Sequence, residues 1–319
     1  MWSSGKTLVE EKQQQNQALE QEIQNFTPQI ERFLTEVNQL ILDKPMQTKL
    51  ALTCLFAGGH VLFEDLPGLG KTTLASALAR LAGLHFQRIQ FTNDMLASDV
   101  IGVNIFNQKE HLFEFKKGPI FTQILLADEI NRCSPKTQSA LLEGMEEGAV
   151  TVDGVQYELP QPFWVLATQN PLFQSGTYAL PESQLDRFLM RLSLGYPSRQ
   201  AEKLLLQQSS RQVLIHQLSA VFSQTDILHL RELSKQIFLS EAVLNYILDL
   251  ATETRKQRHG LSTRAVLALK SAAQAYALVE GRNFVTTDDV QAVFVAVVVH
   301  RLSLAEAEVK QILQSVDVL

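Results

Sequence analysis

The 319-residue sequence has little cysteine, no long apolar run and no excess of positive charge. Its two cysteines, Cys54 and Cys133, do not form a C-x-x-C pair, which argues against a disulfide framework and a zinc site. The longest late apolar run, residues 292–299, has eight residues, whereas a membrane-spanning helix needs about 20. No basic and apolar leader opens the chain. We therefore expect a soluble, cytoplasmic protein in a reducing compartment.

The charge balance limits the class of partner. The 28 basic and 34 acidic side chains give a formal net charge of −6, whereas a protein that wraps nucleic acid needs a basic surface. Nucleic acid is therefore disfavoured as the main partner. Hydrophobic residues make up 45% of the chain and charged residues 19%, as in ordinary folded proteins, and at about 150 residues per domain the length predicts two domains.

The chain begins with a polar segment. Residues 1–26 contain six glutamines and four glutamates, too little apolar surface to pack alone, so we expect a mobile or weakly helical arm. Thr27 and Pro28 are typical of a helix N-cap and first turn, and the apolar residues that follow recur at helical spacing. A helix is therefore predicted from Thr27, and a second over residues 45–57, ending at Gly58 and Gly59.

Residues 27–196 are predicted to form an α/β domain. Short apolar runs alternate here with helical stretches, a pattern typical of a parallel sheet flanked by helices. After Pro197 the strand pattern fades and long helical periodicities follow, for example after Ser240 and from Thr287. Residues 197–319 are therefore predicted to form an all-helical second domain. The predicted strands are residues 60–64, 86–91, 124–128, 163–168 and 190–194.

A glycine-rich turn joins the first predicted strand to a predicted helix over residues 73–82. The sequence LPGLGKT at residues 66–72 fits a phosphate-binding loop, because a polyphosphate needs inward-facing N–H groups, side-chain-free positions and the positive end of a helix. Lys71 would supply a reaching ammonium and Thr72 a hydroxyl for Mg²⁺. The predicted nucleotide-binding residues of this turn are Pro67, Gly68, Leu69, Gly70, Lys71, Thr72 and Thr73.

The loop departs from the usual phosphate-loop pattern at one position. The pattern wants glycine at position 65, where this chain has Asp65. Aspartate tolerates turn geometry, so we expect Asp65 to shape the start of the loop. A carboxylate that pointed at the phosphates would instead weaken nucleotide binding by charge repulsion.

A second motif decides between a phosphate site and a merely steric turn. The sequence ILLADE at residues 124–129 is a buried-strand pattern that ends in two adjacent carboxylates. Ligands bind at the carboxyl ends of such strands. Asp128 would hold Mg²⁺ through its water shell, and Glu129 would orient and polarise the water that attacks the γ-phosphate of ATP. The alternative is a solvated strand end with two surface acids, but the paired motifs favour ATP, with Thr72 and Asp128 as metal-binding residues.

At these residues the chain resembles the AAA+ ATPases, and more narrowly the MoxR family of bacterial ATPases. The resemblance covers about residues 30–302 and implies an AAA+ phosphate-loop core, a smaller all-α lid domain and assembly into a ring, expected to be hexameric. The segments that carry it are PGLGKT at 67–72, DEINR at 128–132, PKTQ at 135–138, ATQNP at 167–171 and LDRF at 185–188.

The resemblance implies roles for three further residues. Asn170 would be sensor 1, an amide that hydrogen-bonds the lytic water or the γ-phosphate, although an Asn-Pro pair can also simply start a turn. Arg187 would be the arginine finger that reaches the neighbouring subunit's ATP, with Arg191 as a second candidate. Arg264 would begin a lid helix and contact the γ-phosphate as sensor 2.

The arginine-finger assignment has its own alternative reading. Arg187 could instead form an ordinary ion pair with Asp186 or Glu182. Arg132, just after the acidic pair, could bridge subunits or lie along the surface.

Two predicted insertions interrupt the α/β domain. Residues 101–117 alternate apolar and polar around a polar turn, which predicts a hairpin-like insert that resembles the helix-2 insert of this clade. Residues 149–159 carry Asp153-Gly154 between short β-rich runs, a strong signal for a two-residue hairpin. Both would project from one face of a ring; the alternative is that they are loop decoration with no partner.

Three functions of different classes fit these features. The first is an Mg-ATP hydrolysing ring that remodels or activates protein clients, with a von Willebrand A domain protein as partner, as the resemblance implies. The second is a nucleic-acid motor, but the predicted hairpin tips at 107–110 and 151–154 supply one lysine against two acids. The third is a nucleotide-gated scaffold with little turnover, which the Asp65 departure leaves open.

Overall fold

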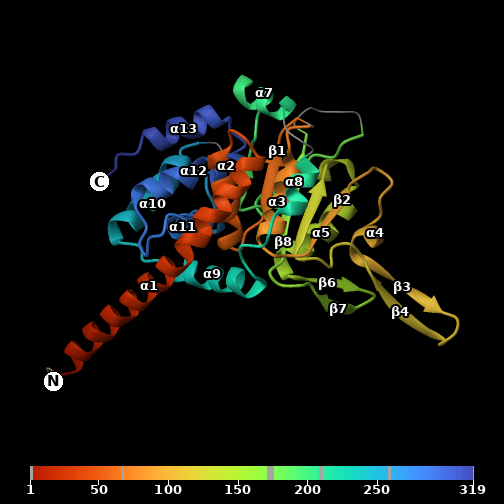
Figure 1. Cartoon of the computed structure of the whole chain (residues 1–319), viewed down its shortest axis with the longest axis horizontal. Coiled ribbons are helices and arrows are strands. Elements are labelled where there is room, and N and C mark those ends of the chain that lie inside the picture. Colours follow the sequence, from red (N-terminus) through yellow and green to blue (C-terminus); the bar gives the residue numbers. More distant parts are fainter. Residues whose placement is uncertain (1–2, 67, 171–175, 208–210, 258–259, 319) are drawn as a thin grey trace.

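The computed structural model describes residues 3–66, 68–170, 176–207, 211–257 and 260–318 (Figure 1). At its centre is a five-stranded sheet with the strand order β2-β5-β8-β1-β9, in which every pair is parallel. These are the five predicted strands, with ends that differ by a residue or two, so the predicted α/β fold is confirmed. The strands are β1 (Val61–Glu64), β2 (Phe86–Gln90), β5 (Ile124–Asp128), β8 (Trp164–Gln169) and β9 (Met190–Leu192).

The central strands of the sheet are buried on both faces, which explains their continuous apolar runs. Ile124 and Leu126 of β5 join a core that includes the helices α1 (Ser3–Leu40), α2 (Pro45–Phe56) and α3 (Lys71–Leu81). Leu125 and Ala127 point the other way, into a second core formed with α5 (Pro135–Glu147) and α4 (Ala97–Ile101). Alternate strand residues therefore face opposite layers of helices, as the pleat requires.

The first helix differs from the prediction. It begins at Ser3, not at Thr27, and Pro28 lies inside it. The Thr27 hydroxyl donates to the carbonyl of Ile23 at 2.9 Å instead of capping a helix start. Ile23 is fully buried in the core, and Phe26 packs beside it. The apolar face thus extends well before Pro28, and its packing against the C-terminal helices stabilises helical turns that the local sequence alone would not.

Both predicted hairpins are present. β3 (Gly102–Asn107) pairs antiparallel with β4 (Leu112–Lys117), and β6 (Ala149–Val152) pairs antiparallel with β7 (Val155–Glu158). Asp153 and Gly154 join the second pair with φ values of 50° and 80°, which suits the predicted two-residue turn. Both hairpins project from the same side of the sheet domain (Figure 1). They touch each other, since the Asn104 amide donates to Asp153 at 2.7 Å.

The named elements that follow β9 in the described chain are all helices. Two begin as the sequence suggests: the Ser240 hydroxyl caps α10, and Thr286 and Asp289 form a capping box at α12. The apolar core is continuous from the sheet into these helices, so both regions share one hydrophobic cluster. The helices are α7 (Arg199–Gln207), α8 (Arg211–Gln217), α9 (Gln224–Gln236), α10 (Glu241–Thr254), α11 (Thr263–Val279), α12 (Thr287–Leu302) and α13 (Glu306–Gln314), and the short α6 (Glu182–Leu185) precedes β9.

The helical region occupies one side of the molecule. α10, α11, α12 and α13 gather on the side of the sheet away from the two hairpins (Figure 1). Within the described ranges, we find no helix with the length and apolar content needed to cross a membrane.

Candidate nucleotide-binding site

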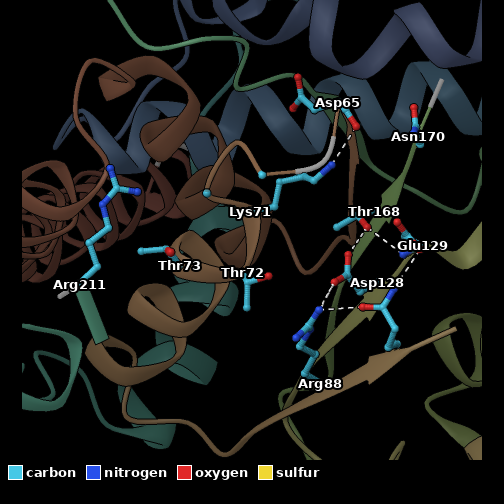
Figure 2. A pocket seen from close by; sticks show the side chains of 13 residues that line it. Asp65, Lys71, Thr72, Thr73, Arg88, Asp128, Glu129, Thr168, Asn170 and Arg211 are labelled. Atoms are coloured by element: carbon cyan, nitrogen blue, oxygen red, sulfur yellow. Dashed lines mark hydrogen bonds and ion pairs between the residues drawn. The ribbon is translucent and has the colours of Figure 1, made fainter. Parts of the chain in front are cut away.

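A cleft of about 420 Å³ lies at the carboxyl edge of the sheet. It is bounded by the loop after β1, the start of α3, the ends of β5 and β8, and one residue of α8 (Figure 2). Leu69 is described but is not among the residues that line it, and Pro67 and Pro171 lie outside the described residues. The predicted residues that line the cleft are Gly68, Gly70, Lys71, Thr72, Thr73, Asp128, Glu129 and Asn170.

The glycine turn has a backbone that favours glycine. Gly68 and Gly70 have φ values of 84° and 90°, in the left-handed region where a side chain is strained. Gly70 is also the N-cap of α3, so the first N–H groups of the helix open towards the cleft. These are the free donors that bind phosphate at the start of a helix.

Lys71 is held at the edge of the cleft. Its ammonium donates to the carbonyls of Asp65 at 2.9 Å and Leu66 at 3.3 Å, which keeps it folded over the turn (Figure 2). Burial lowers the pKa of Lys71, while the carboxylates of Asp65, Asp128 and Glu129 act in the opposite direction. An anion in the cleft would add a further contact that favours the charged ammonium.

Asp65 lines the cleft, but its carboxylate is hydrogen-bonded to the chain after β9. Its carboxylate accepts hydrogen bonds from the Ser193 hydroxyl at 2.7 Å and from the backbone N–H groups of Leu194 at 2.7 Å and Gly195 at 3.1 Å. The side chain therefore ties the start of the loop to the chain just after β9, as the sequence predicted for this position. A glycine could not make these contacts, which occupy the carboxylate with three donors outside the phosphate turn.

The predicted acidic pair stands at the end of β5. The Asp128 carboxylate accepts from the Thr168 hydroxyl at 2.6 Å and from the Arg88 guanidinium at 2.6 Å. Glu129 has a φ of 57°, an uncommon value for glutamate, and its N–H donates to the same Thr168 hydroxyl at 2.9 Å. Thr168 thus fixes both acids at once. The contact reaches the Asp128 carboxylate and the Glu129 backbone from the neighbouring strand β8.

The Glu129 carboxylate has two partners of its own. It accepts from the Gln90 amide at 3.0 Å and forms an ion pair with Arg132 at 2.6 Å. Arg132 therefore bonds within the subunit, whereas the sequence left its role open. Asn170 follows the end of β8 and lines the same cleft as Glu129 (Figure 2).

Four residues of the cleft were missed by sequence reasoning. Arg88 and Gln90 alternate on β2, whose register places Gln90 opposite Asp128. In the sequence, these are only two polar residues, two positions apart, near the end of a predicted strand. They belong to the site because β2 lies next to β5, and this strand order could not be predicted from the sequence. Thr168 and Arg211 are the other two.

The three distant arginines do not line this cleft, as far as its described residues show. Arg187 forms an ion pair with Glu146 of α5 and donates to the Leu142 carbonyl at 3.3 Å. Arg264, at the start of α11 as predicted, also reaches Glu146, at 3.4 Å. Arg191 instead pairs at 2.5 Å with Glu64, at the end of β1. The partner of Arg187 is therefore Glu146 and not the neighbouring acids Asp186 or Glu182.

The segment that carries Arg187 is anchored to α12. The Arg301 guanidinium, whose side chain is 6% exposed, donates to Asp186 at 2.7 Å and to the Phe188 carbonyl at 2.8 Å. The His300 ring is within 2.9 Å of the same carbonyl, and burial lowers the pKa of His300 well below its ordinary value. The residues on either side of Arg187 are thus fixed to a helix of the C-terminal region.

Comparisons with known proteins agree with this architecture. Residues 60–190 match the ATPase family associated with various cellular activities (AAA), and residues 251–318 match the AAA lid domain. Chaperone MoxR1 of Mycobacterium tuberculosis is 39% identical, over 86% of this chain and 76% of its own. The chain belongs to the MoxR family of AAA+ ATPases. The resemblance drawn from the sequence motifs is thereby confirmed.

Two further relatives match this protein over almost its whole length. YeaC of Bacillus subtilis is 44% identical, over 92% of this chain and 96% of its own. The crystal structure of a candidate ATPase from Cytophaga hutchinsonii has 35% identity and a TM-score of 0.86, and the match covers 95% of this chain and 98% of that one. The similarity therefore extends over both the AAA domain and the lid.

Proposed function

We propose that this MoxR-family protein hydrolyses Mg-ATP in the cleft, as a ring-forming ATPase that remodels or activates protein clients. The observation that carries the proposal is the shared cleft: the glycine turn after β1 and the carboxylates at the end of β5 line one cavity. A triphosphate on the N-terminus of α3 would extend towards Glu129. A nucleotide-gated scaffold has less support, because the Asp65 carboxylate is hydrogen-bonded to the chain after β9.

The cleft also offers donors that suit Mg²⁺. The Thr72 hydroxyl and the Asp128 carboxylate both line it, and hard oxygen ligands are those that Mg²⁺ prefers. Each Asp128 oxygen already accepts a hydrogen bond, so we expect Asp128 to hold the ion through water. The ion would neutralise phosphate charge. Glu129 would take a proton from the attacking water, and the Asn170 amide would position that water without adding charge.

The arginines support a ring. Arg187 and Arg264 share Glu146 on one face of the molecule, where the Glu146 side chain is 38% exposed. Because neither residue lines the cleft of its own chain among the described residues, we propose that Arg187 is a finger for the neighbouring subunit's ATP and that Arg264 contacts that same nucleotide. The pairing of Arg191 with Glu64 inside the sheet favours Arg187 as the finger. A hexamer is the assembly that we expect.

The hairpins favour a protein client over nucleic acid. Five apolar side chains of the β3–β4 hairpin are 45% to 72% exposed, a surface that suits contact with other proteins. The relative named Chaperone MoxR1 and the net charge of −6 agree with this reading. A von Willebrand A domain protein is the partner that we propose. The five side chains are Val103, Ile105, Phe106, Leu112 and Phe113.

The first test is the loss of Lys71. Truncating one member of a buried charged contact costs about 2–5 kcal/mol, so Lys71→Ala should weaken Mg-ATP binding about 30-fold or more and stop phosphate release. Isothermal titration calorimetry measures the binding. Lys136→Ala, an exposed lysine at the start of α5, serves as the matched control and should bind like the wild type. Unchanged binding by Lys71→Ala would contradict the site.

The client class is tested by adding nucleic acid. We expect single-stranded and duplex DNA to leave the rate of ATP hydrolysis within about twofold at physiological salt, because a net charge of −6 gives no overall attraction to a phosphate backbone. The measurement is phosphate release with and without each DNA. Strong stimulation by either would favour the motor over the protein remodeller.

A further inference from the structure

One residue of the cleft comes from outside both matched family regions. Arg211 is the first residue of α8, in the segment between residues 190 and 251. It nevertheless lines the cleft, and one guanidinium nitrogen lies 3.5 Å from the position that a Cβ on Gly70 would occupy. α8 packs on α3 and α1, and its residues Leu214 and Ile215 pack against the apolar core. The helix therefore holds Arg211 over the glycine turn.

Among the residues that the structure describes, Arg211 differs from the other cations of the cleft in having no hydrogen-bond or ion-pair partner. Lys71 donates to backbone carbonyls, and Arg88 donates to Asp128. In the part of the chain that the structure describes, Arg211 makes no hydrogen bond or ion pair, although the side chain is partly buried and desolvation lowers its pKa. Removing a guanidinium from water costs free energy unless an anion pairs with its charge. The free donors thus favour an anionic ligand.

The position of Arg211 indicates which part of a nucleotide it meets. Figure 2 shows Arg211 on the side of the cleft where Thr73 lies, whereas Asp128 and Glu129 lie on the other side. The γ-phosphate must face Glu129 if that residue is to act on the attacking water. Arg211, next to Gly70, then faces the phosphates nearer to the ribose. The planar guanidinium fork matches two phosphate oxygens at once.

We propose that Arg211 binds the α- and β-phosphates of the nucleotide held by its own chain. This inference rests on the proposed function and adds a phosphate-binding residue to it. Since these phosphates are common to ADP and ATP, the contact survives hydrolysis. α8 is therefore tied to the core as long as either nucleotide is bound, and it loses this contact only when the nucleotide leaves. Arg264 is not among the described residues that line this cleft, so we do not assign that link to it.

The test compares ADP with a nonhydrolysable ATP analogue. Arg211→Ala should raise the Kd of Mg-ADP and of Mg-AMPPNP by the same factor, about 10- to 100-fold for the loss of charged hydrogen bonds. At saturating ATP, kcat should stay within about twofold, so that KM carries the effect. Arg211→Lys keeps the charge but not the planar guanidinium fork, so its Kd values should lie between those of the wild type and of Arg211→Ala. The control is Arg199→Ala, an exposed arginine on α7, which should bind both nucleotides normally.

Several outcomes would overturn the inference. Unchanged Kd values in Arg211→Ala would do so, as would a loss confined to the triphosphate analogue, since that result would place Arg211 at the γ-phosphate. A lower Tm of nucleotide-free Arg211→Ala would reveal a structural role that a residue without protein partners should not have. If the wild-type protein bound neither nucleotide, the proposed function itself would fail, which is a distinct result. The inference is supported if the Kd values of both nucleotides rise by the same factor while kcat and Tm stay at their wild-type values.

Discussion

Glu129→Gln should bind Mg-ATP with wild-type affinity and form the same assemblies, while its rate of hydrolysis falls about 10²- to 10⁴-fold, the usual contribution of a general base. Glutamine has the size of glutamate but cannot take a proton from water. Its amide oxygen can still accept from Gln90, which donates to Glu129 at 3.0 Å. The Thr168 hydroxyl accepts from the backbone N–H of residue 129, so that contact is kept as well. Binding and chemistry should therefore separate in this variant.

Three measurements check this result: phosphate release, calorimetric ATP binding, and size-exclusion chromatography with ATP. Glu143→Gln is the matched control, because Glu143 is an exposed glutamate of α5 away from the cleft, and it should hydrolyse ATP at the wild-type rate. Equal hydrolysis by Glu129→Gln and the wild type would remove Glu129 from the role of base. Loss of ATP binding in Glu129→Gln would instead indicate a structural role.

The residues that could be predicted from the sequence are those whose positions follow from local chain geometry. The glycine turn follows a strand and opens a helix, so Gly70 and Lys71 fall on the phosphate side whatever the rest of the fold does. Asp128 ends a buried strand, and the carboxyl ends of parallel strands share one edge. Both motifs needed only strand periodicity and short-range spacing.

The residues that were missed depend on which elements become neighbours. Thr168 fixes Asp128 and Glu129 only because β8 pairs with β5, and Arg88 meets Asp128 only because β2 takes the other side of β5. Strand order is a property of the whole sheet, and periodicity in one strand does not encode it. Arg211 is more distant still, since α8 must fold back over the turn to bring it there.

The start of the first helix was predicted wrongly for a different reason: a local helix-start signal was present, but tertiary packing outweighed it. Thr27 and Pro28 are good residues for a helix start. However, Ile23 is buried in the main core, so helical turns before Pro28 gain burial that outweighs one missing hydrogen bond. The glutamine-rich composition concealed this because only a few apolar positions of that segment make the contact.

Equal mixtures of Arg187→Ala and Lys71→Ala should hydrolyse ATP although each variant alone is inactive. Arg187→Ala keeps an intact cleft, and Lys71→Ala keeps an intact finger, so a mixed ring with a head-to-tail interface holds about one quarter of its sites complete. An arginine finger is worth about 10³ to 10⁵ in rate, which makes recovered activity easy to detect. Phosphate release is measured after co-assembly with ATP.

The control replaces Lys71→Ala by the double variant Lys71→Ala/Arg187→Ala, which brings neither an intact cleft nor a finger and should restore nothing. Equal activity in the two mixtures would exclude action between subunits. Arg187 must leave Glu146 and the Leu142 carbonyl to reach a neighbouring cleft. An ion pair near the surface contributes about 0–1 kcal/mol and a hydrogen bond about 0.5–1.5 kcal/mol. Arg264 would leave Glu146 as well, since we propose that it contacts the same nucleotide. The gain from a finger, about 4 to 7 kcal/mol in the transition state, exceeds that cost, so assembly can draw Arg187 across the interface.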